Sequence, residues 1–206
     1  METNVASEHL QTIRTLMERS ALYRLALAPV MMVSGSIGLA AAIASRFVAL
    51  ETNRAFSLFW LGVSLVAIVA AFFLVRRQAI KDAEPFWSLP TKRVTQALLP
   101  AFFVGFAAGA FNAFREPLTG AWLLALGWII IYGCALHAAG SYMRNRMKLF
   151  GWIFVLGGCG VLFASTEWPA LKTTAAAHQL MGLFFGALHL ACGVYLYFTE
   201  KRKTAE

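Results

Sequence analysis

The chain has 206 residues, of which 59% are hydrophobic and only 14% are charged. Soluble domains usually contain about 25% charged residues, so this composition argues strongly against an ordinary soluble protein. The formal net charge of +8 raises the question of a nucleic-acid partner, which the positions of the basic residues then answer.

Long uncharged stretches follow one another along the chain and predict transmembrane helices. A bilayer core is ~30 Å thick, and a helix needs ~20 mostly apolar residues to cross it. Six such stretches are present, at residues 25–44, 56–75, 94–113, 121–139, 149–166 and 179–198. Their apolar residues run continuously rather than alternating, which favours helices over barrel strands. We therefore predict an all-α transmembrane bundle over 25–199, followed by a basic tail at 200–206.

The segment before the first predicted span, residues 1–24, carries an apolar stripe. Leu10, Ile13, Leu16 and Met17 fall largely on one helical face. This pattern is typical of an amphipathic helix that lies on the inner leaflet. A docking helix for a cytoplasmic protein partner and a simple extension of the first span are the alternatives.

The basic residues are distributed very unevenly between the two sides of the predicted bundle. Fourteen of the 18 Lys and Arg residues fall before the first span, in the second and fourth loops, or in the tail. The positive-inside rule then places both termini in the cytoplasm. Orientation accounts for the positive charge without nucleic acid, and this basic face should attract anionic lipid head groups. Short outer loops and the strong charge bias favour a bacterial inner membrane.

Proline and glycine mark points of special geometry inside the predicted spans. Pro29 and Pro100 each remove a backbone hydrogen bond and favour a kink. Two GxxxG patterns, at 105–109 and 182–186, indicate close helix packing, because small residues let backbones approach each other.

The predicted spans lack the residues that membrane enzymes and proton-coupled transporters use. All ten acidic residues lie outside the spans, and no Lys or Arg lies deep within one. This distribution argues against a carboxylate-based proton antiporter and against a di-acid hydrolase. The chain also has no phosphate-binding glycine loop and no G-x-S-x-G motif. We therefore expect a protein that is not an enzyme.

Two Cys/His pairs form the candidate metal site. Cys134 and His137 lie in the fourth predicted span, and His189 and Cys192 lie in the sixth. Each pair is three residues apart and shares a helical face, and all four fall within a depth range under ~8 Å. If these helices pack face to face, the set suits zinc or copper, or the two histidines could bind haem. Simple packing and hydrogen bonding within the bundle is the more economical explanation.

Three functional hypotheses follow from these features. The one we favour is a membrane-embedded accessory or regulatory subunit, with a cytoplasmic protein partner or a second copy of the chain. The first alternative is a small-solute or ion transporter or channel. The second is an intramembrane metal- or haem-binding protein that uses His137 and His189.

Overall fold

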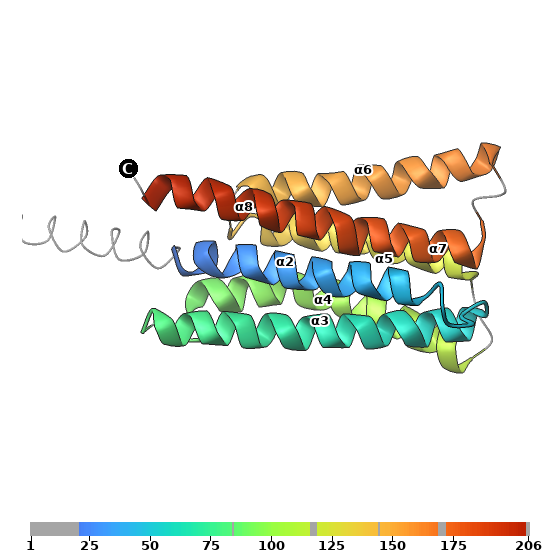
Figure 1. The fold of residues 1–206 in the computed structure, drawn as a ribbon, viewed down its shortest axis with the longest axis horizontal. Coiled ribbons are helices and arrows are strands. Elements are labelled where there is room, and N and C mark those ends of the chain that lie inside the picture. The colour runs from blue at the N-terminus through green and yellow to red at the C-terminus, as the bar shows by residue number, and fades with distance from the viewer. Residues whose placement is uncertain (1–20, 84, 116–118, 144, 169–171, 205–206) are drawn as a thin grey trace, which may run out of the picture.

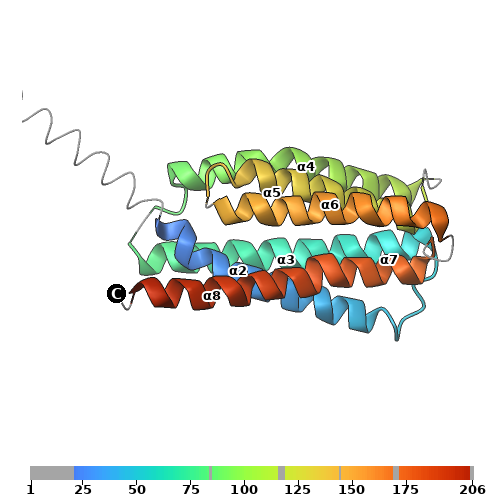
Figure 2. The same cartoon turned by 90° about the horizontal axis from the view of Figure 1, so that it is seen from above.

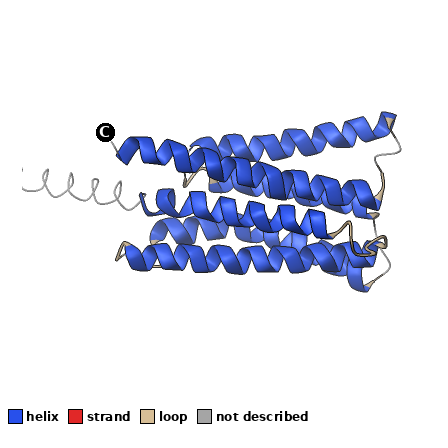
Figure 3. Cartoon of the chain, viewed as in Figure 1, coloured by secondary structure: helices blue, strands red, loops and turns tan. Residues whose placement is uncertain are grey.

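The computed structural model describes residues 21–83, 85–115, 119–143, 145–168 and 172–204. Most of the predicted amphipathic segment, residues 1–20, lies outside the described residues, and residues 21–24 belong to the first described helix. Every regular element in the described part of the chain is helical (Figure 3).

The elements follow one another as a series of long helices. They are α2 (Ala21–Ala44), α3 (Asn53–Lys81), α4 (Leu89–Phe114), α5 (Ala121–Ala139), α6 (Asn145–Glu167), α7 (Thr174–Met181), the π-helix η2 (Gly182–Leu188) and α8 (His189–Thr204). The last three form one continuous rod. The described residues thus contain six helices long and apolar enough to cross a membrane. This confirms the six predicted spans, and each predicted stretch lies inside one of these helices.

Local chemistry sets several of the helix boundaries. The side chain of Thr52 accepts a hydrogen bond from the backbone N–H of Ala55, which caps the start of α3. Thr173 does the same for Ala176 at the start of α7. Pro90 stands in the first turn of α4, where its missing N–H costs no helical hydrogen bond.

The helices run side by side along the long axis of the molecule (Figure 1). Seen from above, they form two layers, one of α3, α2 and the α7–α8 rod, the other of α4, α5 and α6 (Figure 2). The described chain begins and ends at the same end of the bundle, here called the terminal end, and the opposite end is called the distal end (Figure 1). Helix α2 packs against both α3 and the η2–α8 part of the rod, and α5 packs against both α4 and α6.

Hydrogen bonds join the helices at the distal end. Trp60 of α3 donates its Nε1–H to Nδ1 of His178 in α7, at 2.9 Å. The side-chain oxygen of Asn53 accepts the backbone N–H of Ala121, at 2.9 Å. These bonds connect the start of α3 with α5 and α7.

Much of the outer surface is apolar. Large side chains of α3 such as Leu65, Val66 and Phe73 are more than half exposed. Only 6% of the apolar window of α3 is buried inside the protein, against 50% for α5. Extended apolar surfaces are rare on soluble monomers, so this surface is suited to contact with lipid.

Candidate functional site

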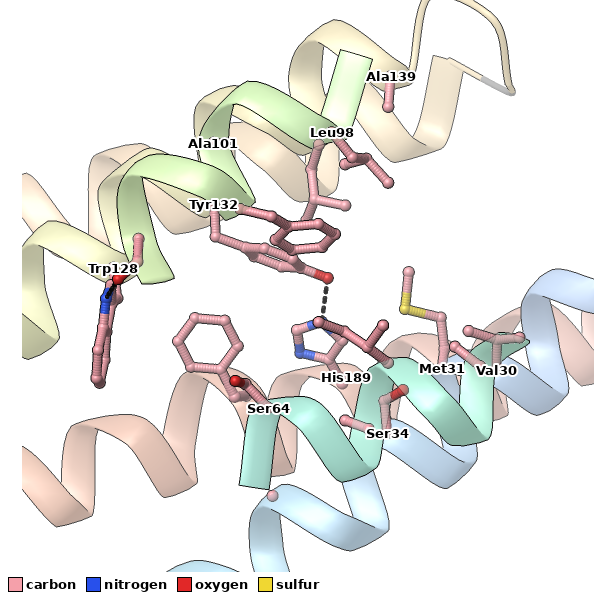
Figure 4. A pocket seen from close by; sticks show the side chains of 18 of the residues that line it. Val30, Met31, Ser34, Ser64, Leu98, Ala101, Trp128, Tyr132, Ala139 and His189 are labelled. Carbon is pink, nitrogen blue, oxygen red and sulfur yellow. Dashed lines mark hydrogen bonds between the residues drawn. The ribbon is translucent and has the colours of Figure 1, made fainter. Parts of the chain in front are cut away.

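A cavity of about 370 Å³ lies between the two layers, bounded by α2, α3, α4 and α5 and by residues of the α7–α8 rod (Figure 4). Small-molecule sites usually have volumes of about 300–1,000 Å³. The lining on α2 runs from Ala26 to Gly38, which corresponds to roughly 18 Å at ~1.5 Å per residue. Among the described residues that line it, none is Asp, Glu, Lys or Arg. The cavity is therefore elongated, and its chemistry suits an uncharged, mostly apolar molecule.

A few polar side chains interrupt the apolar lining. They come from five helices and are Ser34, Ser64, Thr95, Tyr132 and His189. Four of these, Ser34, Ser64, Tyr132 and His189, are labelled in Figure 4 around the middle of the cavity. Apolar pockets with a few placed polar groups are typical of ligand sites, since the polar groups fix the orientation of the ligand.

Tyr132 and His189 form the central polar contact, and its direction can be assigned. The Tyr132 oxygen lies 2.9 Å from Nε2 of His189, and Nδ1 of the same ring lies 2.9 Å from the carbonyl oxygen of Phe184. A carbonyl can only accept, so Nδ1 carries a proton, and in the neutral imidazole Nε2 is then the acceptor. The Tyr132 hydroxyl therefore donates its hydrogen to His189, and its oxygen keeps lone pairs free to accept.

The π-helix and several aromatic rings hold the His189 ring in place. The carbonyl that accepts from Nδ1 belongs to Phe184, five residues earlier and inside η2. Phe185 stacks on the imidazole with 19° between the planes. Phe150 and Phe154 meet it edge-on, each with ring centroids 5.3 Å away. The residue is only 3% exposed, so it is immobilised. π-Helical turns occur frequently at functional sites.

Trp128 forms part of the cavity wall and is fixed against α4. Its Nε1–H donates to the carbonyl oxygen of Gly105, at 2.7 Å. A Cβ atom placed on Gly109 would lie 2.6 Å from the indole ring. The first predicted GxxxG pattern therefore accommodates this ring, not a second helix backbone.

The second GxxxG pattern does mediate close contact between helices. A Cβ atom on Gly182 would collide with Ala42 of α2, and one on Gly186 would lie 2.8 Å from the backbone nitrogen of Leu39. Substituting either glycine would push α2 away from the α7–α8 rod. This agrees with the packing role predicted for the pattern.

The structure places the four residues of the predicted metal site in different surroundings. Cys134 is exposed, and Nδ1 of His137 faces the carbonyl oxygen of Lys148 at 3.5 Å. His189 is bonded to Tyr132 as described, and Cys192 packs against a buried apolar cluster. Among the described residues, no group of three or more His, Cys, Asp or Glu side chains is placed to hold a metal ion. The geometry gives no support to a metal or haem site, which stays a prediction.

The glycines that accompany each Cys/His pair explain this separation. A Cβ atom on Gly133 of α5 would lie 2.8 Å from the carbonyl oxygen of Gly151, so this face of α5 packs on α6. A Cβ atom on Gly193 of α8 would lie 2.7 Å from the backbone nitrogen of Met32, so that face packs on α2. The glycine face of α5 therefore packs on α6, and the glycine face of α8 packs on α2.

Sequence reasoning did not identify Tyr132 as a functional residue. The available signal was a phenol in the middle of a predicted span, because a polar group at membrane depth needs a hydrogen-bond partner. The chain matches no protein-family model, no curated protein and no solved structure. Functional inference therefore depends on the geometry of the cavity.

Proposed function

We propose that the protein is a non-enzymatic, membrane-embedded accessory protein that binds one neutral, mostly apolar molecule in the cavity. The observation that carries this proposal is the cavity itself, about 370 Å³, whose described lining residues include no Asp, Glu, Lys or Arg. A charged ligand would find no counter-ion there, and burying an unpaired charge is very costly. The Tyr132–His189 pair supplies a polar contact within a mostly apolar wall.

We further propose that the bundle lies in the inner membrane of a bacterium, with both termini in the cytoplasm. Two observations support it: the described chain begins and ends at one end of the bundle (Figure 1), and most of the Lys and Arg residues that the structure describes fall in segments at that end. A fluorescent protein that folds only in the cytoplasm, fused after Glu206, should fluoresce.

Ligand binding can be tested with a long-chain alcohol that carries bromine, which quenches tryptophan fluorescence on contact. Trp60 and Trp128 both line the cavity, so binding in purified protein should give saturable quenching at one molecule per chain. Ala67 of α3 also lines the cavity, and Ala67→Phe should fill the space and abolish the saturable component.

Ala107 of α4 provides the matched control, because it is exposed and does not line the cavity. Ala107→Phe adds the same ring to the outer surface and should leave quenching unchanged. Quenching that never saturates, or that is equal in the two variants, would contradict binding inside the bundle.

A small-solute transporter is a second candidate, supported by the arrangement of the helices. The chain can be divided into two halves of three spans each, α2–α4 and α5–α8. Helix α2 is central in one layer, between α3 and the α7–α8 rod, and α5 is central in the other, between α6 and α4 (Figure 2). Each central helix therefore lies between the next helix of its own half and the last span of the other half. Such an exchange of halves is characteristic of inverted-repeat transporters. Proteoliposomes that swell in glycerol faster than empty vesicles would favour transport, and equal rates would favour binding alone.

A further inference from the structure

The direction of the hydrogen bond at Tyr132 restricts the chemistry of the ligand. Its hydroxyl donates a hydrogen bond to Nε2 of His189. The neutral ring has one proton, which lies on Nδ1 and is donated to the Phe184 carbonyl, so Nε2 cannot become the donor in its place. What Tyr132 offers to a molecule in the cavity is therefore an acceptor. A ligand group that meets it favourably must donate a hydrogen.

Aromatic rings line the cavity around this acceptor. Phe102 of α4 stacks on Tyr132 with 26° between the planes, and Phe185 lies 5.1 Å from it between ring centroids. Trp128, one helical turn before Tyr132, has its indole fixed by the carbonyl of Gly105. Aromatic pairs gain from offset or edge-on contacts beyond simple burial of area, so these walls favour a ligand with a flat ring.

A free hydroxyl lies on another wall of the cavity. Ser34 of α2 lines the space near His189 (Figure 4), and its side chain forms no hydrogen bond with another described residue. It can donate to, or accept from, a second oxygen on the same ring.

We propose that the ligand of the cavity carries a neutral hydroxylated aromatic ring, of the phenol or quinol class, on an apolar chain. The ring hydroxyl donates to the oxygen of Tyr132, and the chain extends along the apolar walls formed by α3 and α4. This inference rests on the proposed function. A quinone or an ether presents only lone pairs to the Tyr132 oxygen and binds more weakly, and a carboxylate would be an unpaired charge in this lining.

The test uses three probes that differ only at the ring: a 4-alkylphenol, its methyl ether, and a saturated alcohol of matched length. Each competes with the brominated alcohol, and the readout is the recovery of tryptophan fluorescence in purified protein. One neutral hydrogen bond in an apolar site corresponds to roughly a tenfold change in affinity. We expect the phenol to compete at roughly tenfold lower concentration than its methyl ether, and the saturated alcohol to be weaker than the phenol.

Two variants locate the effect. Tyr132→Phe alone would leave Nε2 of His189 unpaired and able to accept from a phenol. The double variant Tyr132→Phe/His189→Leu removes both acceptors, so the phenol and its ether should then compete equally. Ser34→Ala breaks no hydrogen bond between described residues, so it still provides a test if the first variant does not fold. It should leave the discrimination between phenol and ether intact but weaken a quinol, whose second oxygen it contacts.

The outcomes separate this inference from the proposed function. If the brominated alcohol gives no saturable quenching, the cavity does not bind apolar ligands and both fail. If it binds, but the methyl ether competes as well as the phenol, the hydroxyl-donor inference alone is overturned. Discrimination that persists in the double variant, which has neither acceptor, would also overturn it.

Discussion

The bundle contains two kinds of helix contact, and their difference explains where the cavity lies. Along α2 and the η2–α8 segment, and again along α5 and α6, glycines bring the backbones of two helices into direct contact. Along α3, buried residues are confined to Phe56, Ser57 and Trp60 at the distal end and to Ala79 near the other end. Between these positions α3 faces the cavity on one side and is exposed on the other.

The comparison teaches how a membrane protein can keep an internal space open. Lipid tails are as apolar as the side chains they meet, so helices associate through close packing and hydrogen bonds rather than through the hydrophobic effect. The two glycine-rich contacts supply that packing. They allow the middle of α3 to carry few buried residues without loss of the bundle, and the space beside α3 is available to a ligand.

The largest loss of stability should come from adding a side chain at a glycine contact. A Cβ atom on Gly35 would collide with the backbone of Leu190, and backbone cannot rotate away. Gly35→Leu should therefore destabilise by at least the ~1–3 kcal/mol typical of overpacking. Gly62→Leu is the matched control, because nothing lies within 4 Å of the Cβ position. Unfolding in mixed detergent micelles measures both, and equal losses would refute the distinction.

A smaller effect should come from the distal attachment of α3. Trp60→Phe removes the donor to Nδ1 of His178 and leaves that nitrogen unpaired. We expect a loss of about 1 kcal/mol in the free energy of unfolding. Trp168→Phe is the control, since Trp168 is 64% exposed. If both variants have the same free energy of unfolding as the wild type, this hydrogen bond does not stabilise the attachment of α3.

The smallest effect should follow from filling the cavity. Ala67→Leu adds volume where space exists, so stability should stay within about 1 kcal/mol of the wild type, or rise. The same change at Ala125, which is fully buried in α5, should cost roughly 1–3 kcal/mol. Thermal unfolding of the two purified variants shows directly which of them is less stable. A larger loss for Ala67→Leu would mean that the space beside α3 is closed in the membrane.

The architecture could be predicted from the sequence because it depends on local composition. Each apolar stretch needs only its own length and lack of charge to be recognised as a span, and all six are found as helices. The partners of each helix could not be predicted in this way. Gly182 and Gly186 were recognised as packing positions, but the sequence does not state that their partner helix is α2.

The candidate site was missed for the same reason. His189 was singled out as a polar residue at membrane depth, yet its partners come from α5, α6 and η2. Tyr132 becomes meaningful only when the ring nitrogen that accepts its hydrogen is known. That depends on the carbonyl of Phe184, whose availability follows from the π-helical turn.

The pairing of α2 with the η2–α8 segment determines when, during synthesis of the chain, this helix contact can form. Gly35 belongs to the first span, whereas its contacts Gly186 and Leu190 belong to the last. At ~5–20 residues per second, the ~150 residues between them take roughly 8–30 s to synthesise. During that interval the glycine face of α2 has no partner within the chain, and it must be shielded by lipid or by the insertion machinery. This contact therefore forms only after η2 and α8 have been synthesised, and a ribosome that stalls before them leaves α2 without its partner.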